Sequence, residues 1–81
     1  MNIYVGNLNY KIDENDLREV FEEYGTVDET KIITDRETGR SKGFGFVTMP
    51  DNKEASEAVE SLNGATLENR NMVVNESKPR S

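Results

Sequence analysis

The chain has 81 residues, a formal net charge of −6, and neither cysteine nor histidine. One small domain fits this length, and the missing residue types exclude disulfides, thiolate chemistry, zinc sites and histidine-based catalysis. No stretch approaches the ~20 apolar residues of a membrane span, and no signal peptide is visible, so we expect a cytoplasmic protein that does not associate with a membrane. We also expect a monomer that binds no cofactor and no metal.

The first half of the chain predicts a strand, a helix and a second strand. Residues 3–8 alternate apolar side chains with others, which indicates a strand. A helix is predicted after Asp13, the expected N-cap, because apolar residues recur at i, i+3, i+4 and i+7, namely Leu17, Val20, Phe21 and Tyr24. Gly25 suits the left-handed backbone position that ends a helix. Residues 27–34 predict the second strand, with Lys31 on its outward face.

The third predicted strand contains the most informative pattern of the chain. It follows a charged, turn-rich segment at residues 35–41, which predicts a mobile hairpin loop. Residues 42–49 have the sequence Lys-Gly-Phe-Gly-Phe-Val-Thr-Met. Because strand side chains alternate faces, Phe44 and Phe46 lie on the same side. Two exposed rings side by side favour a flat ligand, and every nucleic-acid base has a flat π-face.

The last third of the chain predicts a second helix and a fourth strand. Pro50 ends the third strand, and Asp51 with Glu54 makes a capping-box-like start for a helix. Its apolar stripe has helical spacing and consists of Ala55, Ala58, Val59 and Leu62. Residues 65–71 predict a polar connection, and residues 72–76 predict the last strand. We therefore expect a folded domain over residues 1–77 and a short polar tail over residues 78–81.

The predicted order is β-α-β-β-α-β, which implies an α+β, ferredoxin-like fold. Two βαβ units with right-handed crossovers give a four-stranded antiparallel sheet with both helices packed on one face. The opposite face stays open. That open face displays Tyr4, Phe44 and Phe46, because the alternate positions on the same strands are mainly aliphatic and face the helices.

The negative charge is concentrated in the two predicted helices. Residues 13–24 contain six acidic residues against Arg18, a net charge of −5, and residues 51–62 contain four against Lys53, a net charge of −3. The rest of the chain therefore has a net charge of +2. Since the helices lie on the far side of the sheet from the aromatic residues, the acidic composition does not oppose binding of a polyanion at the open face.

Two motifs give the chain a specific resemblance to a known family. The octamer at residues 42–49 agrees at seven of its eight positions with the longer signature of the RNA recognition motif. Residues 3–8, Ile-Tyr-Val-Gly-Asn-Leu, are similar to the shorter signature on the first strand. With the βαββαβ order, the resemblance covers essentially the whole chain, which looks like the small bacterial proteins that contain one such motif. Met49 departs from the usual aromatic residue, and alternation places Met49 in the core.

The resemblance implies single-stranded RNA as the partner, with single-stranded DNA as an alternative. In the family, aromatic residues of the first and third strands stack consecutive bases, which here would be Tyr4 and Phe44. Phe46 would lie against a sugar, and Lys42 would meet a phosphate. Two outward polar residues would bond base edges, namely Lys31 and Asn75. Four cations of the loop and tail would follow the phosphate backbone, namely Arg36, Arg40, Lys78 and Arg80.

Other functions would use other parts of the sequence. A protein-interaction module would attract a basic partner through the acidic face of the first helix, around Glu19, Glu22 and Glu23. The aromatic rings could also have a different role, in which a C-terminal helix or a partner protein covers them. Independently of this, Lys42 could be an ordinary solvated surface charge. Small phosphate-ester and acyl-phosphate hydrolases share the βαββαβ order, but fold alone does not imply function. We expect no catalysis and no small-molecule substrate.

Overall fold

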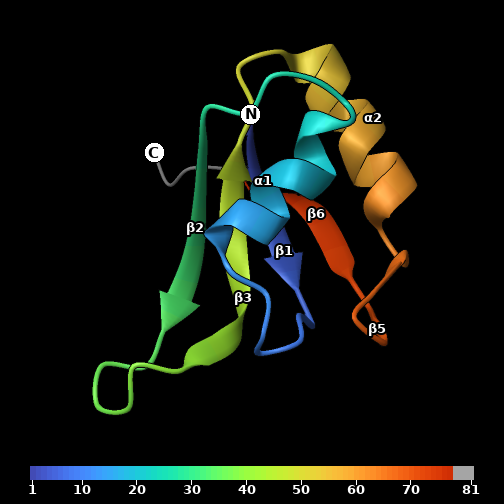
Figure 1. The fold of residues 1–81 in the computed structure, drawn as a ribbon. Coiled ribbons are helices and arrows are strands. Elements are labelled where there is room, and N and C mark those ends of the chain that lie inside the picture. Colours follow the sequence, from blue (N-terminus) through green and yellow to red (C-terminus); the bar gives the residue numbers. More distant parts are fainter. Residues whose placement is uncertain (78–81) are drawn as a thin grey trace.

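The computed structural model describes residues 1–77, in which a four-stranded sheet is covered on one face by two helices (Figure 1). The elements of this main layer pair are β1 (Asn2–Gly6), α1 (Glu14–Glu22), β2 (Glu29–Thr34), β3 (Ser41–Thr48), α2 (Asn52–Leu62) and β6 (Val73–Ser77). Two short strands, β4 (Thr66–Leu67) and β5 (Arg70–Asn71), form a separate hairpin. The predicted tail, residues 78–81, lies outside the described residues.

The strand order across the main sheet is β2-β3-β1-β6, and every neighbouring pair is antiparallel. Both helices lie on the same side of this sheet (Figure 1). The predicted ferredoxin-like α+β fold is therefore confirmed. The two sequence motifs occupy β1 and β3, which are the central pair of strands, and their side chains on the helix-free side share one open face.

Helix α1 begins at the predicted N-cap, Asp13. The Asp13 carboxylate accepts from the Asp16 backbone N–H at 2.9 Å, and the Asp16 carboxylate accepts from the Asp13 N–H at 3.1 Å. These reciprocal bonds satisfy two N–H groups that have no partner within the helix. The helix end differs from the prediction, because Gly25 has a φ of 158° and is nearly extended. Instead, the Tyr24 N–H donates to the Phe21 carbonyl at 3.0 Å and closes the last turn.

Helix α2 begins with half of the predicted capping box. The Asp51 carboxylate accepts from the Glu54 N–H at 2.9 Å, as expected for an N-cap. The Glu54 carboxylate, however, accepts from the Thr26 N–H at 3.2 Å. Glu54 therefore connects the start of α2 to the segment between α1 and β2. Beyond the helix, Gly64 has a φ of 84°, the left-handed conformation that glycine adopts without strain.

The hydrophobic core lies between the sheet and the two helices. Its sheet side consists of the alternating buried residues Ile3, Val5, Val47, Met49 and Val74, and its helix side includes Leu17, Phe21, Ala55, Ala58 and Leu62. Met49 has no exposed surface, so its predicted place in the core is confirmed. Val20, Tyr24 and Val59, on the edges of the helix stripes, are half-buried against the same cluster.

The segment at residues 65–71 contains a hairpin, which the sequence did not reveal, because it predicted only a polar connection there. Thr66 pairs with Asn71 and Leu67 with Arg70, and the two turn residues Glu68 and Asn69 have φ values of 49° and 65°. Two successive positive φ values are the geometry of a tight hairpin turn. Such turns favour glycine or asparagine, and Glu68 is neither, which explains why the sequence pattern did not reveal this hairpin.

Candidate nucleic-acid interface

A single row of four residues crosses the open face of the sheet from edge to edge. In the strand register, Tyr4 of β1 lies opposite both Asn75 of β6 and Phe46 of β3, and Phe46 lies opposite Lys31 of β2. Directly opposed residues of antiparallel strands project to the same face. The row therefore places two aromatic rings at the centre, an amide on one side and an ammonium group on the other.

Three aromatic rings form a cluster on this face, and we call Tyr4, Phe44 and Phe46 the aromatic platform. The ring centroid of Tyr4 is 6.0 Å from that of Phe44 and 5.9 Å from that of Phe46, and the two phenylalanine centroids are 6.4 Å apart. Each of these residues is half-buried. Their distances are typical of aromatic pairs that support one another, so the rings are mutually positioned while part of each surface stays exposed.

The glycines of the two motifs have packing reasons for being glycine. A Cβ built on Gly6 would lie 2.5 Å from the Tyr4 hydroxyl oxygen, so the Tyr4 ring extends along its own strand over Gly6. A Cβ on Gly45 would lie 2.2 Å from the Lys31 backbone carbonyl oxygen. The first glycine leaves room for a platform ring, and the second lets β2 and β3 approach each other closely.

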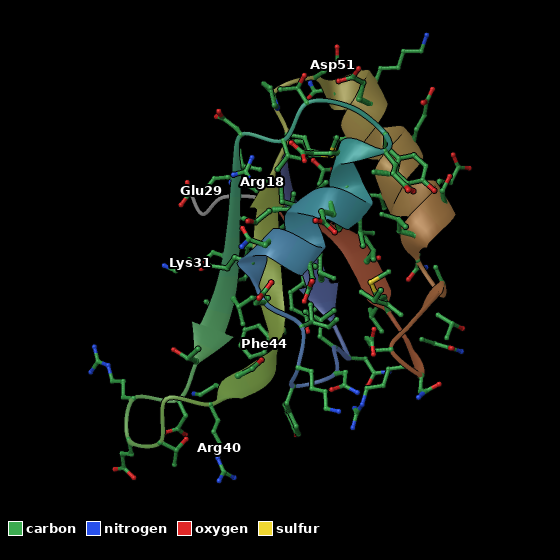
Figure 2. All side chains as sticks on the ribbon, viewed as in Figure 1. Arg18, Glu29, Lys31, Arg40, Phe44 and Asp51 are labelled. Atoms are coloured by element: carbon green, nitrogen blue, oxygen red, sulfur yellow. The ribbon has the colours of Figure 1, made fainter. Side chains whose placement is uncertain are left out.

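The candidate cations lie around the platform at different places. Lys31 is exposed at the β2 edge and shares with Phe46 the lining of a small hollow, and Figure 2 shows it extending away from that edge. Arg40 and Lys42 are exposed and line a larger hollow of about 930 Å³ together with Phe44. We call this larger depression the Phe44 hollow. Arg40, in Figure 2, extends from the loop end of β3.

The remaining candidate residues differ in their position relative to the aromatic platform. Arg36 is exposed in the turn between β2 and β3 and is not part of the lining of either hollow. Lys78 and Arg80 lie outside the described residues. Asn75 is exposed beside Tyr4. The structure thus brings Lys31, Lys42, Arg40 and Asn75 around the aromatic platform and leaves Arg36 apart from it.

The loop between β2 and β3 is organised by Asp35. Its backbone N–H donates to the Arg40 carbonyl at 2.7 Å, and its carbonyl accepts from the Gly39 N–H at 2.8 Å. Its carboxylate accepts from the N–H groups of Glu37 and Thr38 at 2.8 and 3.2 Å. These hydrogen bonds favour the charged form and hold the pKa of the Asp35 carboxyl below its ordinary value. One oxygen of this carboxylate, Oδ1, therefore accepts hydrogen bonds from two N–H groups of its own loop.

The opposite side of the molecule is acidic. The exposed residues of α1 include Glu14, Glu19 and Glu22, and those of α2 include Glu57 and Glu60. Arg18 pairs with Glu22 at 4.0 Å and donates to the Val27 carbonyl at 3.1 Å. Because the helices cover the other face of the sheet, this negative charge is separated from the aromatic platform, as the sequence predicted.

Sequence reasoning did not identify Tyr10 and Arg70 as part of this surface. Tyr10 is 66% exposed and lines the Phe44 hollow, and the Arg70 guanidinium lies 5.7 Å from the Tyr10 ring centroid. The sequence feature that could have identified Tyr10 is the presence of an aromatic residue in a largely polar segment just after the first motif. Arg70 joins it only through the fold, because Arg70 belongs to a hairpin that the sequence did not predict.

Within residues 1–77, no three acidic side chains gather to hold a metal ion, and no helix of this part is long and apolar enough to cross a membrane.

The fold and the open face together define a small βαββαβ domain that presents aromatic side chains on a four-stranded sheet. A family model described as the RNA recognition motif matches residues 3–73. The chain belongs to the RNA recognition motif family.

Individual relatives agree with this assignment. The chain is 51% identical over 80 residues to the "Putative RNA-binding protein RbpA" of Synechocystis, covering 99% of this chain and 79% of the relative. A crystal structure of RNA Binding Protein PG1 has a TM-score of 0.95 at 49% identity, covering all of this chain and 98% of the other. A complex of the Sxl-lethal protein with RNA has a TM-score of 0.91 at 28% identity, and the match covers 99% of this chain and 48% of the other.

Proposed function

We propose that the chain binds single-stranded RNA, without catalysis, by stacking bases on the aromatic platform. The observation that supports this most directly is the cluster of Tyr4, Phe44 and Phe46, whose centroids lie about 6 Å apart on the helix-free face of the sheet. Base stacking on aromatic side chains contributes roughly 1–3 kcal/mol per base. Two stacked bases would therefore contribute roughly 2–6 kcal/mol to binding. This contribution does not require a strongly basic surface, and the chain has a net charge of −6.

Each platform residue has a proposed role. Tyr4 and Phe44 stack consecutive bases, and Phe46, which lies opposite Tyr4 in the strand register, packs against a sugar. Lys42 meets a phosphate from the Phe44 side of the sheet. The row partners Asn75 and Lys31 bond base edges, since one flanks Tyr4 and the other flanks Phe46 on the same face. The cations Arg36, Arg40, Lys78 and Arg80 follow the phosphate backbone.

A single strand is the proposed form of the ligand because only unpaired bases can lie flat on the platform. Bases of duplex RNA are already stacked and turn their edges, not their faces, to a protein. We therefore expect duplex RNA to bind poorly. Single-stranded DNA is the second ligand to compare, because aromatic stacking does not depend on the 2′-hydroxyl group. A comparison of RNA and DNA strands of the same sequence measures the contribution of that hydroxyl.

The domain extent, the oligomeric state and the cellular location of the protein belong to the same proposal. We propose that residues 1–77 act as one monomeric domain, with residues 78–81 as a polar tail, and that the protein works in the cytoplasm without a small-molecule substrate. Sedimentation of the free and RNA-bound chain measures the oligomeric state. The acidic face of α1 is assigned no part in RNA binding, because it lies on the opposite side of the sheet from the platform.

The direct test is titration of a short single-stranded RNA with the wild-type chain and with the Tyr4→Ala/Phe44→Ala double variant. The double variant should lose most of its affinity, because both stacking rings are removed. Circular dichroism of each protein shows whether the fold is retained. A folded double variant that binds as tightly as the wild type would contradict the proposed function.

A further inference from the structure

Tyr10 is an aromatic ring that the structure holds in solvent next to the platform. It is 66% exposed, whereas Leu8 and Ile12 on either side of it in the chain are 1% and 4% exposed. The two buried neighbours anchor the segment, so Tyr10 projects from a short loop whose ends are fixed in the core. Single exposed aromatic residues are common on protein surfaces, and the surroundings of this one decide whether it has a use.

The loop that presents Tyr10 is connected to the β4–β5 hairpin by side-chain hydrogen bonds. The Asn7 side chain donates to the Asn71 carbonyl at 2.8 Å and accepts from the Arg70 guanidinium at 3.2 Å. The Asn9 side chain donates to the Glu68 carbonyl at 3.1 Å. These three bonds join segments about 60 residues apart in sequence. The loop that carries Tyr10 is therefore held in place before any ligand arrives, which lowers the entropic cost of binding at this loop.

The ring of Tyr10 faces surroundings that suit one nucleotide. It lines the Phe44 hollow together with Phe44, Arg40 and Lys42, so an aromatic surface and two cations border the same depression. The Arg70 guanidinium, 5.7 Å from the ring centroid, adds a third cation beside it. The Asp35 carboxylate in the hollow already accepts two backbone N–H groups. A flat group with an attached phosphate matches this combination of charge and aromatic surface.

We propose that Tyr10 and Arg70 form a further nucleotide position, in which a base stacks on Tyr10 and its phosphate meets Arg70, Arg40 or Lys42. This inference rests on the proposed function, because the nucleotide is the neighbour of the one stacked on Phe44 along the same strand. The RNA then runs from the platform into the Phe44 hollow. The bound segment is one nucleotide longer than the platform alone accommodates.

The test is a length series of random-sequence single-stranded RNA pools, from two to five nucleotides, titrated with the wild type, Tyr10→Ala, Tyr10→Phe and Phe44→Ala. The wild type should gain affinity at the length at which a base first reaches Tyr10. Tyr10→Ala should lose that gain, about 5-fold or more, and bind the shortest pool as tightly as the wild type. Tyr10→Phe keeps the ring and should keep the gain.

The salt dependence tests the part of Arg70. Arg70→Gln should make the salt slope of the longer pools shallower by about 0.7, the value of one phosphate contact on a single strand.

The outcomes of the length series distinguish failure of this inference from failure of the proposed function. If Tyr10→Ala binds every pool like the wild type while Phe44→Ala is weakened, the further position is refuted and the platform stands. If a folded Phe44→Ala also binds like the wild type, the proposed function itself fails. NMR signals of the Tyr10 ring that do not move on RNA addition would also overturn the inference.

Discussion

The Tyr4 ring lies over Gly6, two residues ahead on the same strand, so closely that a Cβ on Gly6 would stand 2.5 Å from the Tyr4 hydroxyl oxygen and 2.8 Å from Cζ. The glycine of the first motif therefore determines where the Tyr4 ring, which we propose stacks a base, can lie. Because the clash is with the end of a side chain, an added methyl group would move the ring more readily than it would disturb the sheet. This relationship gives a prediction that separates stability from binding.

Gly6→Ala should weaken RNA binding about 5-fold or more, because the displaced Tyr4 ring can no longer stack a base. The thermal unfolding midpoint should change much less than the affinity. The control is a double-mutant cycle with Tyr4→Ala, in which Gly6→Ala should have little further effect on affinity once the ring is absent. Additive losses of affinity in the double variant would show that Gly6 acts independently of Tyr4.

Phe44→Ala should weaken RNA binding by about 5- to 150-fold, the range that corresponds to one base stacked on an aromatic side chain. Phe44→Tyr keeps a flat ring and should retain most of the affinity, whereas Phe44→Leu keeps apolar bulk without a π-face and should resemble the alanine variant. Titration calorimetry or fluorescence anisotropy measures all four proteins. Equal binding by the leucine variant and the wild type would mean that burial of apolar surface, not stacking, supplies the affinity.

The salt dependence of binding should be shallow. Of the cations proposed to follow the phosphate backbone, we expect on the order of two to four to contact a short strand at once, which gives a slope of about −1.4 to −2.8 in log K against log salt for a single strand. Titrations at several sodium chloride concentrations measure the slope. A slope near −6 would require many more phosphate contacts than two to four and would make charge, instead of stacking, the main source of affinity.

The loop around Asp35 should respond to acid. Hydrogen bonds from the N–H groups of Glu37 and Thr38 lower the pKa of the Asp35 carboxyl from its ordinary value of 3.8. A carboxyl with a lowered pKa in the folded state stabilises the fold above its unfolded-state pKa, and that contribution disappears as the pH falls through the folded-state pKa. NMR titration should show a Glu37 amide signal that is constant near pH 7 and moves only in acid, with a midpoint below the ordinary value of 3.8. Asp35→Asn should remove that acid transition.

The parts of the structure that the sequence predicted depend on local rules. The Asp13 cap follows from one residue type at a helix start, and the burial of Ile3, Val5 and Met49 follows from alternation along a strand. The open face with its rings follows from the same alternation and the element order. These features need no knowledge of which distant segments meet.

The parts that the sequence missed depend on distant contacts. The hairpin at residues 66–71 has a turn without glycine, in which Glu68 and Asn69 both adopt positive φ. It is connected to the first loop through Asn7 and Asn71, which are 64 residues apart. The pairing of Tyr10 with Arg70 follows from that connection. A pattern read along the chain contains no sign of either contact.

The most direct test of the account is NMR shift mapping of the labelled chain with a short single-stranded RNA, with a duplex of matched sequence as control. We predict that the single strand shifts the signals of Tyr4, Phe44 and Phe46, together with Lys31 and Asn75 in the same row across the sheet. The duplex should shift them much less. Shifts confined to the exposed acidic residues of α1, with the platform signals unchanged, would contradict the account.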